Sequence, residues 1–297
     1  MTILAAFSFV HHDSASIELG ATLARSAGQP LRVVTIVPAP WGTPAAEGTD
    51  KEFKYWADRA GQEAVTRARE LIAEHCTGVD SEVVAIHARS VPGGLLEEAQ
   101  RCEASMIVVG SGHDGPYGRI ALSSVADRLL HSSPVAVAIA SRGYLATEHG
   151  RVTRATCAFR GDEVSRRTLT QTAAICQIVG AGLRIATFAV RGRTMYTSGV
   201  SPRSEDDVVS VWVQRARAMQ SEALAELRDS GEVPEDVDTT VAVGQTWAAT
   251  LDRLPWDRDE VLVVGSSASA SFLSRIFLGS SGAKIIRHAP VPVIVVP

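Results

Sequence analysis

The most constraining feature of the sequence is an internal repeat at a nearly constant spacing. Three short motifs of the first half recur in the second half, displaced by 155 residues in the first case and by 156 in the other two. The matching segments are Ile107–Ser111 with Leu262–Ser266, Arg119–Ser124 with Arg275–Ser280, and Pro134–Val137 with Pro290–Val293. Chance matches at one spacing are rare, so the chain is predicted to contain two copies of one folding unit.

The length of 297 residues leaves room for two domains of about 150 residues each. We expect one domain over residues 1–142 and the other over 152–297. The polar stretch Gly143–Arg151 between them is interpreted as a short connector.

Within each half, short apolar runs alternate with longer amphipathic ones, which is typical of a parallel sheet covered by helices. The strands are expected at Ile3–Ser8, Leu31–Val37, Ser81–His87, Met106–Gly110 and Val135–Ala140, then at Arg154–Phe159, Leu183–Val190, Val237–Val243, Val261–Gly265 and Val291–Val296. The helices are expected near Ser14–Ala27, Lys51–Cys76, Gly93–Cys102, Ser124–Leu130 and Glu205–Asp229. The fold class is therefore α/β, with two tandem open five-stranded parallel sheets.

The two long helices carry apolar residues at spacings of three and four, which predicts one buried face on each. On the first this face contains Phe53, Trp56 and Ala64, and on the second Val208 and Trp212. Both tryptophans are interpreted as packing residues.

The last strand of each half is apolar, and the final one contains Pro292, which cannot donate to a ladder and belongs on a sheet edge or at a strand start. An uncharged edge invites pairing. The terminal strands of the two halves are expected to lie against each other, which would relate the halves by a pseudo-twofold axis, or to pair in a homodimer.

Composition excludes several functional classes. The net charge is −4 and the basic residues are dispersed, unlike the basic stripe of a nucleic-acid-binding protein. No apolar stretch approaches the roughly 18 residues of a membrane span, and the N-terminus lacks the basic region of a signal peptide, so a cytoplasmic protein is expected. The four cysteines form no C-x-x-C pair and are expected to be buried free thiols.

A Gly- and Ser-rich loop follows the fourth strand of each half and leads into a helix. Ligands of open parallel sheets lie beyond the carboxyl ends of the strands, and helix N-termini favour anions. Gly110–Gly115 fits the pattern G-x-G-x-x-G, but it follows the fourth strand and lacks the acidic residue that a dinucleotide fingerprint requires. No nucleophile, paired-carboxylate or metal-ligand set stands out, so an enzyme is not expected.

These features together resemble the universal stress protein family. The likeness covers nearly the whole chain twice, in strand order, in the V-V-G-S segment, in the R-I-x-L-x-S helix start and in the Pro-Val terminal strand. The resemblance implies the adenine nucleotide alpha-hydrolase-like fold. It also implies a G-x2-G-x9-G-[S/T] loop that holds ATP, accompanied in some cases by Mg²⁺, and an Asp just after the first strand, near the ribose.

Both halves depart from that binding pattern. In the first, His113 stands where the second Gly is expected and Ser123 where the third is, while Gly112 comes one residue early. In the second, Ala268 replaces the second Gly, and Gly279-Ser280 comes one residue late. The Asp after the first strand is interpreted as missing from both halves. The second half, with Gly279-Ser280 intact, is the preferred nucleotide site.

The candidate nucleotide-binding residues have simpler alternative roles that remain open. Arg119 and Arg275 contact either a phosphate or a loop carboxylate. In His11-His12-Asp13, the acid or Ser14 caps the first helix and the histidines face solvent. The full set of candidates is Gly110, Gly112, Arg119, Ser123, Ser124, Gly265, Ser267, Arg275, Gly279 and Ser280.

Two functional hypotheses follow from the resemblance. The first is a stress-response regulatory protein that binds ATP or another adenine nucleotide in one or both domains, with at most weak ATPase activity. The second is a degenerate tandem module that binds no cofactor and acts as a protein-interaction scaffold.

Overall fold

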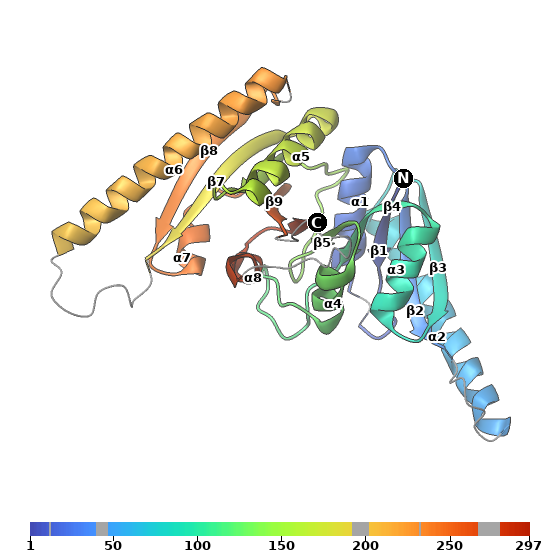
Figure 1. Ribbon diagram of the computed structural model, residues 1–297. Coiled ribbons are helices and arrows are strands. Elements are labelled where there is room, and N and C mark those ends of the chain that lie inside the picture. Colours follow the sequence, from blue (N-terminus) through green and yellow to red (C-terminus); the bar gives the residue numbers. More distant parts are fainter. Residues whose placement is uncertain (12, 40–46, 192–201, 232, 267–279) are drawn as a thin grey trace. The chain divides into compact units, whose positions relative to one another are not determined.

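The computed structural model describes residues 1–11, 13–39, 47–191, 202–231, 233–266 and 280–297, with the side chains of 47–50, 202–206 and 280 left aside. The chain divides into two compact units. Unit 1 comprises Met1–Arg151, and unit 2 begins at Val152. Each unit is a sheet with helices on both faces (Figure 1).

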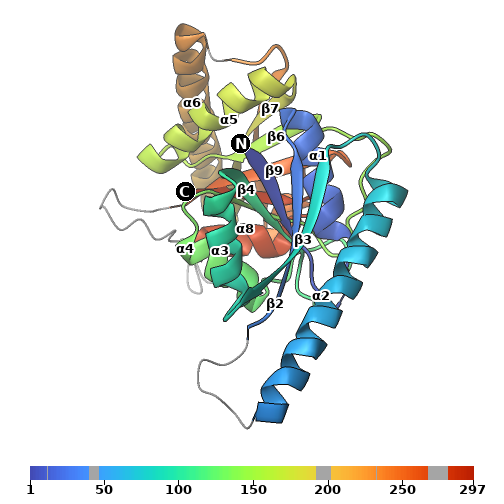
Figure 2. The same ribbon diagram turned by 90° about the vertical axis from the view of Figure 1, so that its right-hand side faces the viewer.

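Unit 1 contains a five-stranded sheet in the order β3-β2-β1-β4-β5, and every pairing in it is parallel. Helices α1 and α2 contact each other on one face, and α3 and α4 contact each other on the opposite face (Figure 2). The strands are β1 (Thr2–Ala6), β2 (Leu31–Pro38), β3 (Ser81–Ala88), β4 (Ala104–Val109) and β5 (Ala136–Ile139). The helices are α1 (Ala15–Ala27), α2 (Glu47–His75), α3 (Val91–Arg101) and α4 (Ser124–Ser132).

Unit 2 repeats this arrangement, with the parallel order β10-β9-β6-β7-β8. Its strands are β6 (Arg154–Ala158), β7 (Gly182–Val190), β8 (Val237–Gly244), β9 (Glu260–Gly265) and β10 (Val293–Val296). Its described helices are α5 (Glu163–Val179), α6 (Pro202–Ser230), α7 (Trp247–Leu251) and α8 (Ser280–His288). The predicted α/β class with two tandem parallel sheets is confirmed, while the expected pairing of the terminal strands stays a prediction.

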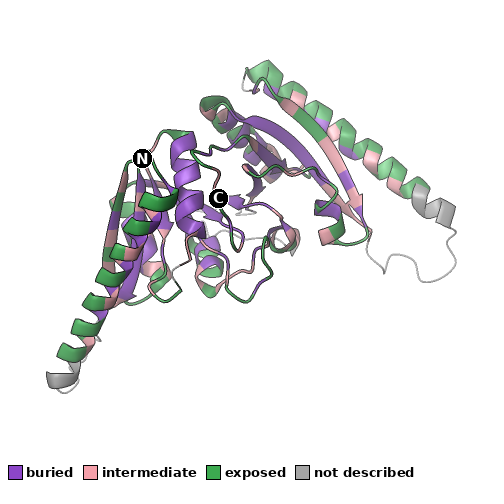
Figure 3. Cartoon of the chain, turned by 180° about the vertical axis from the view of Figure 1, so that it is seen from behind, coloured by how far each residue is buried: buried purple, intermediate pink, exposed green. Residues whose placement is uncertain are grey.

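The core of each unit lies between the sheet and its helices, where the central strands are buried on both faces (Figure 3). In unit 1, Leu4, Val33 and Ile107 are fully buried on adjacent strands. Continuous apolar runs rather than alternating ones mark such strands in a sequence, because helices cover both sides of the sheet. This is why the strand positions expected from the sequence agree with the structure to within about two residues.

The predicted packing face of the two long helices is wrong at their N-terminal parts. Trp56 is 50% exposed and Trp212 is 39% exposed. The buried face of α2 passes instead through Ala57, Gly61 and Ala64, where a side chain on Gly61 would press on Ala85 of β3. Small residues let the helix approach the sheet closely, and the bulky rings therefore lie beside the contact rather than in it. The Trp56 ring contacts Phe53 and Phe9.

The connector between the units is not a loose polar segment but is fastened to α1. The backbone N–H of Ala146 donates to Glu18 Oε2 at 2.8 Å, and Arg25 Nη1 donates to the carbonyl of Gly150 at 2.9 Å. Glu18, Arg25 and Tyr144 are all buried. The connector therefore belongs to the packed structure of unit 1.

Candidate functional site

A cavity of about 680 Å³ opens at the carboxyl ends of β1, β2 and β4 in unit 1. This is the edge where ligands of open parallel sheets bind. Two loops form most of its wall, the β1–α1 loop (7–14) and the β4–α4 loop (110–123), and the first turns of α3 and α4 complete it. The residues that line the cavity include Phe7, Phe9, His11, Asp13, Val34, Ile36, Gly110, Gly112, His113, Asp114, Ser123, Ser124 and Val125.

The β1–α1 loop is fixed by hydrogen bonds at both ends. Phe7 N–H donates to the carbonyl of Val34 on β2, at 2.9 Å, which extends the ladder past the end of β1. The hydroxyl of Ser8 accepts from the backbone N–H groups of Val10 and His11, both at 3.2 Å. A short polar side chain that bonds its own backbone two or three residues on stabilises a turn. The turn places His11 at the cavity.

Asp13 supplies the carboxylate that the sequence was interpreted as lacking. Its Oδ1 accepts from Ala15 N–H at 3.2 Å, at the start of α1, so the predicted capping contact is present. Its Oδ2 is the nearest atom, at 3.7 Å, to the position that a Cβ on Gly110 would take. No Asp follows β1 directly, as the sequence shows, but the loop brings Asp13 back to the cavity from seven positions past β1.

The β4–α4 loop is closed by contacts across its base. Gly112 N–H donates to the carbonyl of Ala121 at 2.7 Å, and Ala121 N–H donates to Ser111 Oγ at 2.8 Å. A Cβ on Gly115 would lie 2.6 Å from the Cβ of Ala121, so this position accepts only glycine without a shift of the loop. The close approach of Ala121 explains the glycine at position 115 and the tight fit at Gly112.

Ser123 has a structural role at the entrance to α4. Its side chain accepts from Ala126 N–H at 3.1 Å and caps the helix. The first N–H groups of a helix lack intrahelical partners and carry partial positive charge. Ser124 and Val125, at the start of α4, line the cavity. This end of the cavity can therefore accept an anionic group.

The rings of His11 and His113 meet at the cavity with centroids 3.7 Å apart and planes tilted by 39°. One ring comes from each loop. Both side chains are exposed, as the sequence predicted for His11, yet both also line the cavity.

The structure brings four of the candidate nucleotide-binding residues together around the cavity: Gly110, Gly112, Ser123 and Ser124. Arg119 lies in the same loop, where its carbonyl accepts from Arg142 N–H, but it is not among the lining residues. Ser267, Arg275 and Gly279 fall outside the described residues, as does the side chain of Ser280, which begins α8. The preference for the second half therefore stays a prediction.

Gly265, the counterpart of Gly110 in unit 2, has a different neighbourhood. A Cβ there would lie 2.1 Å from Thr168 Oγ1 and 3.2 Å from Val164 Cγ1, both on α5. The β6–α5 loop is only four residues long (159–162), against eight for the β1–α1 loop. Met219 of α6 lies against Gly161 in this short loop. In the described part of unit 2, helix side chains thus occupy the space next to the strand end.

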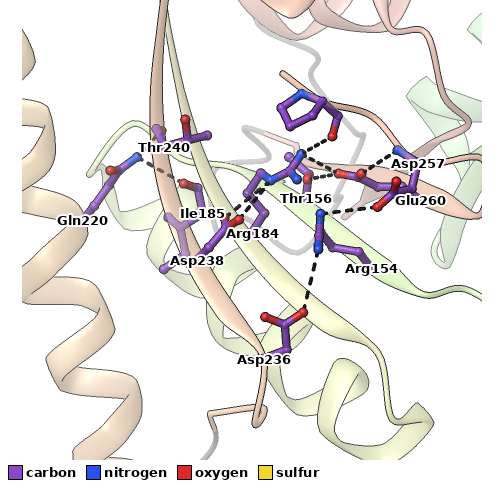
Figure 4. Close-up of polar contacts among 11 residues, drawn as sticks. Arg154, Thr156, Arg184, Ile185, Gln220, Asp236, Asp238, Thr240, Asp257 and Glu260 are labelled. Carbon is purple, nitrogen blue, oxygen red and sulfur yellow. Dashed lines mark hydrogen bonds and ion pairs between the residues drawn. The ribbon is translucent and has the colours of Figure 1, made fainter. Parts of the chain in front are cut away.

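A second cluster of polar groups lies at the amino ends of the unit 2 strands (Figure 4). Arg184 Nη1 donates to Glu260 Oε1 at 3.1 Å and to the carbonyl of Pro255 at 3.2 Å, and both charged side chains are buried. Thr156 and the N–H of Asp257 also donate to Glu260. Burial raises the pKa of Glu260, and these hydrogen bonds with the charge of Arg184 offset that rise only in part.

Unit 1 has a related ion pair, built differently. Arg32 Nε donates to Glu98 Oε1 at 2.5 Å, and Arg101 also donates to Glu98. Burial acts to raise the pKa of Glu98, but the hydrogen bonds and charges of the two arginines outweigh it and leave the pKa lowered. The unit 1 cluster lies at the amino ends of its strands, away from the cavity, and the unit 2 cluster lies at the amino ends of its own strands, so we interpret both as structural.

The cysteines provide no nucleophile. Cys76, Cys157 and Cys176 are buried free thiols, as predicted, and Cys102 is half-buried. Burial raises the pKa of Cys76 and Cys176 to about 11 and that of Cys157 to about 12. A thiol with so high a pKa is protonated at neutral pH and unreactive.

The model of the universal stress protein family matches residues 1–141 and 153–297. The chain belongs to the universal stress protein family. It is 36% identical, over all 297 residues of both chains, to a universal stress protein of Mycobacterium tuberculosis. A universal stress protein structure from Archaeoglobus fulgidus matches 99% of this chain and 97% of its own, with 17% identity and a TM-score of 0.60. Another from that organism, solved in complex with dAMP, matches 48% of this chain and 98% of its own, with 21% identity and a TM-score of 0.33.

The residues that sequence reasoning missed are on the β1–α1 loop of this universal stress protein: Phe7, Phe9, His11 and Asp13. One signal could have found them. The distance from the first strand to the first helix is longer in the first half than in the second, and extra residues at the carboxyl edge of a parallel sheet are well placed for binding.

Among the described residues, we find no helix with the length and hydropathy that crossing a bilayer requires.

Proposed function

We propose that unit 1 binds an adenine nucleotide in the cavity at the carboxyl ends of β1, β2 and β4. The observation that carries the proposal is the convergence of the Asp13 carboxylate, the open backbone at Gly110 and the start of α4 on one cavity. Its volume lies within the range of about 300–1,000 Å³ typical of small-molecule sites. Membership of the universal stress protein family favours an adenine nucleotide over other ligands of that size.

Each part of such a ligand has a matching part of the wall. Phe9 and Val91, which line the cavity and retain exposed area, offer an apolar surface for a base. The Oδ2 of Asp13, beside Gly110, can accept a hydrogen bond from a sugar hydroxyl. The first turn of α4 offers backbone N–H groups to a phosphate.

The proposed role is regulatory. Occupancy of the cavity would change how the chain assembles or which proteins it contacts during stress, without turnover of the nucleotide. ATP, with Mg²⁺ bound to its phosphates, remains the ligand first implied by the sequence. A cytoplasmic location and a homodimer stay predictions alongside it.

The test is calorimetric titration of the purified full chain with ATP, AMP and adenosine. We expect Asp13→Asn to weaken adenosine binding about tenfold, because a hydrogen bond from a sugar hydroxyl to a charged acceptor contributes about 1.5–3 kcal/mol. Asp80→Asn is the matched control, since Asp80 is exposed at the opposite sheet edge, ahead of β3. Absence of binding by all three ligands would favour the alternative of a scaffold without nucleotide.

A further inference from the structure

The cavity of unit 1 lacks a permanent positive charge. Among its described lining residues there is no lysine or arginine. The titratable groups that face it are His11 and Asp13 from the β1–α1 loop and His113 and Asp114 from the β4–α4 loop. The lining parts of β2, α3 and α4 contribute only apolar or hydroxyl side chains. Two carboxylates thus oppose an anionic ligand, and among these described lining groups a side-chain cation arises only by protonation of His11 or His113.

The two imidazoles lie where one anionic group can reach both. Their ring centroids are 3.7 Å apart, and each ring comes from a different wall of the cavity. Two protonated imidazoles at this separation repel each other, because like charges a few ångströms apart interact by kilocalories even near a surface. A phosphate placed against the rings would remove that repulsion and favour the protonated state of the pair.

We propose that His11 and His113 form a titratable anion-binding subsite, so that the binding of a phosphorylated ligand is coupled to the uptake of a proton from solvent. This proposal rests on the proposed nucleotide site and adds that the affinity of the site for a phosphorylated ligand depends on pH. Histidine is the side chain type that most often changes its charge within the physiological pH range, which sets the pH values at which the coupling is tested. Affinity for a phosphorylated ligand rises as the pH falls from about 8.5 to 6.5, and affinity for an uncharged nucleoside does not.

The loop geometry keeps both rings at the subsite. The Ser8 hydroxyl accepts from His11 N–H, and the bond from Gly112 to Ala121 closes the loop next to His113. Substitution of either ring by glutamine therefore removes the titrating group while leaving these backbone bonds in place. Glutamine also retains a hydrogen-bond donor, so the variants separate charge from hydrogen bonding.

The experiment is calorimetric titration of the full chain with AMP and with adenosine at pH 6.5, 7.5 and 8.5. Each titration is repeated in two buffers with different ionisation enthalpies, which reports the protons taken up. For AMP we expect about a tenfold gain in affinity from pH 8.5 to 6.5, with net proton uptake, because one linked proton changes affinity by at most about tenfold per pH unit. Adenosine should show neither effect.

The variants separate titration of the protein from titration of the AMP phosphate. The double variant His11→Gln/His113→Gln should lose the pH dependence of AMP binding and keep its affinity for adenosine. His75→Gln, an exposed histidine at the end of α2, is the control and should behave as the unchanged chain.

Three results would overturn the inference. AMP affinity that does not change with pH, or the same pH dependence in the double variant, would overturn it alone and leave the nucleotide site standing. Failure of both AMP and adenosine to bind at any pH would overturn the nucleotide site as well.

Discussion

The two units of this chain share one sheet order but differ at the edge where ligands bind. In unit 1, eight residues join the first strand to the first helix, and they wall a cavity. In unit 2, four residues make the same connection, and α5 packs against Gly265. The sheet order has been kept in both copies, while the length of the loop between the first strand and the first helix differs. In such a duplicated protein, the fold assignment holds for both halves and the function must be argued for each half separately.

The units also differ at their amino edges, where each holds a buried glutamate. Glu98 is bound by two arginines and has a lowered pKa. Glu260 forms an ion pair with Arg184, is fully buried, and has a raised pKa even though the charges of Arg184 and Arg154 act to lower it. The pKa of the buried glutamate is thus lowered in unit 1 and raised in unit 2, although each glutamate is paired with an arginine.

The strongest test of the comparison is to give unit 1 the short loop of unit 2. Deletion of residues 9–12 leaves four residues between β1 and α1 and removes Phe9 and His11 from the cavity wall. We expect loss of detectable AMP binding by calorimetry, because both a wall and a polar subsite disappear. The circular dichroism spectrum should remain that of the unchanged chain. Retained AMP affinity would show that the long loop is not what makes unit 1 different.

The next effect concerns the buried ion pairs. Arg184→Met leaves the Glu260 carboxylate buried without its partner, and removing one member of such a pair costs about 3–5 kcal/mol of unfolding free energy. Arg32→Met should cost less, about 1–2 kcal/mol, because Arg101 still bonds Glu98. Urea unfolding followed by circular dichroism measures both. Equal losses would mean that the second arginine of unit 1 contributes nothing.

A smaller effect is expected at the paired glycines. Gly265→Ala would press its methyl group on Thr168 of α5, and overpacking of this kind costs about 1–3 kcal/mol. Gly110→Ala meets only Asp13 Oδ2 at 3.7 Å, an ordinary contact, and should change stability by less than about 0.5 kcal/mol. The two urea midpoints should therefore separate. If both variants unfold alike, the strand end of unit 1 is as crowded as that of unit 2.

The smallest expected effect is the change of the unfolding free energy with pH, which Glu98 and Glu260 should influence with opposite signs. The pKa of Glu98 is lowered on folding, so its carboxylate stabilises the folded chain above the unfolded value of about 4.3, and that contribution is lost as pH falls through the folded pKa. The pKa of Glu260 is raised, so stability rises as pH falls through its folded pKa.

These opposite signs are separable by substitution. Moving from pH 7 to pH 4, the unfolding free energy of the unchanged chain should fall relative to that of Glu98→Gln and rise relative to that of Glu260→Gln. Urea titrations at a series of pH values give both differences. Differences of the same sign would contradict the comparison.

The fold could be predicted from the sequence because its signals are local and occur twice. A short apolar run such as Leu31–Val37 predicts a buried strand. The repeat at 155–156 residues predicts two folding units. The buried face of the long helices could not be assigned from spacing alone. Trp56 and Ala57 are adjacent in sequence, and only the close approach of the helix to the sheet decides which of them is buried.

The site was only partly predictable for a related reason. Gly110 and Ser123 stand at fixed distances from a recognisable strand, so the sequence identified them. Asp13 lies seven positions past the end of β1, and no periodicity relates it to Gly110. Its approach depends on the Ser8 turn and on the contact with Ala15, local bonds of the folded loop that no spacing in the sequence reveals.

The attachment of the connector to α1 bears on how the two copies can be taken apart. A fragment that stopped at residue 141 would strip Ala146 from the Glu18 carboxylate and Gly150 from the Arg25 guanidinium, and would leave two charged groups on α1 without those partners. A fragment extended to Arg151 would keep the hydrogen bonds from Ala146 to Glu18 and from Arg25 to Gly150. We therefore expect a fragment that ends at Arg151 to be more stable than one that ends at residue 141, where the first match to the family ends.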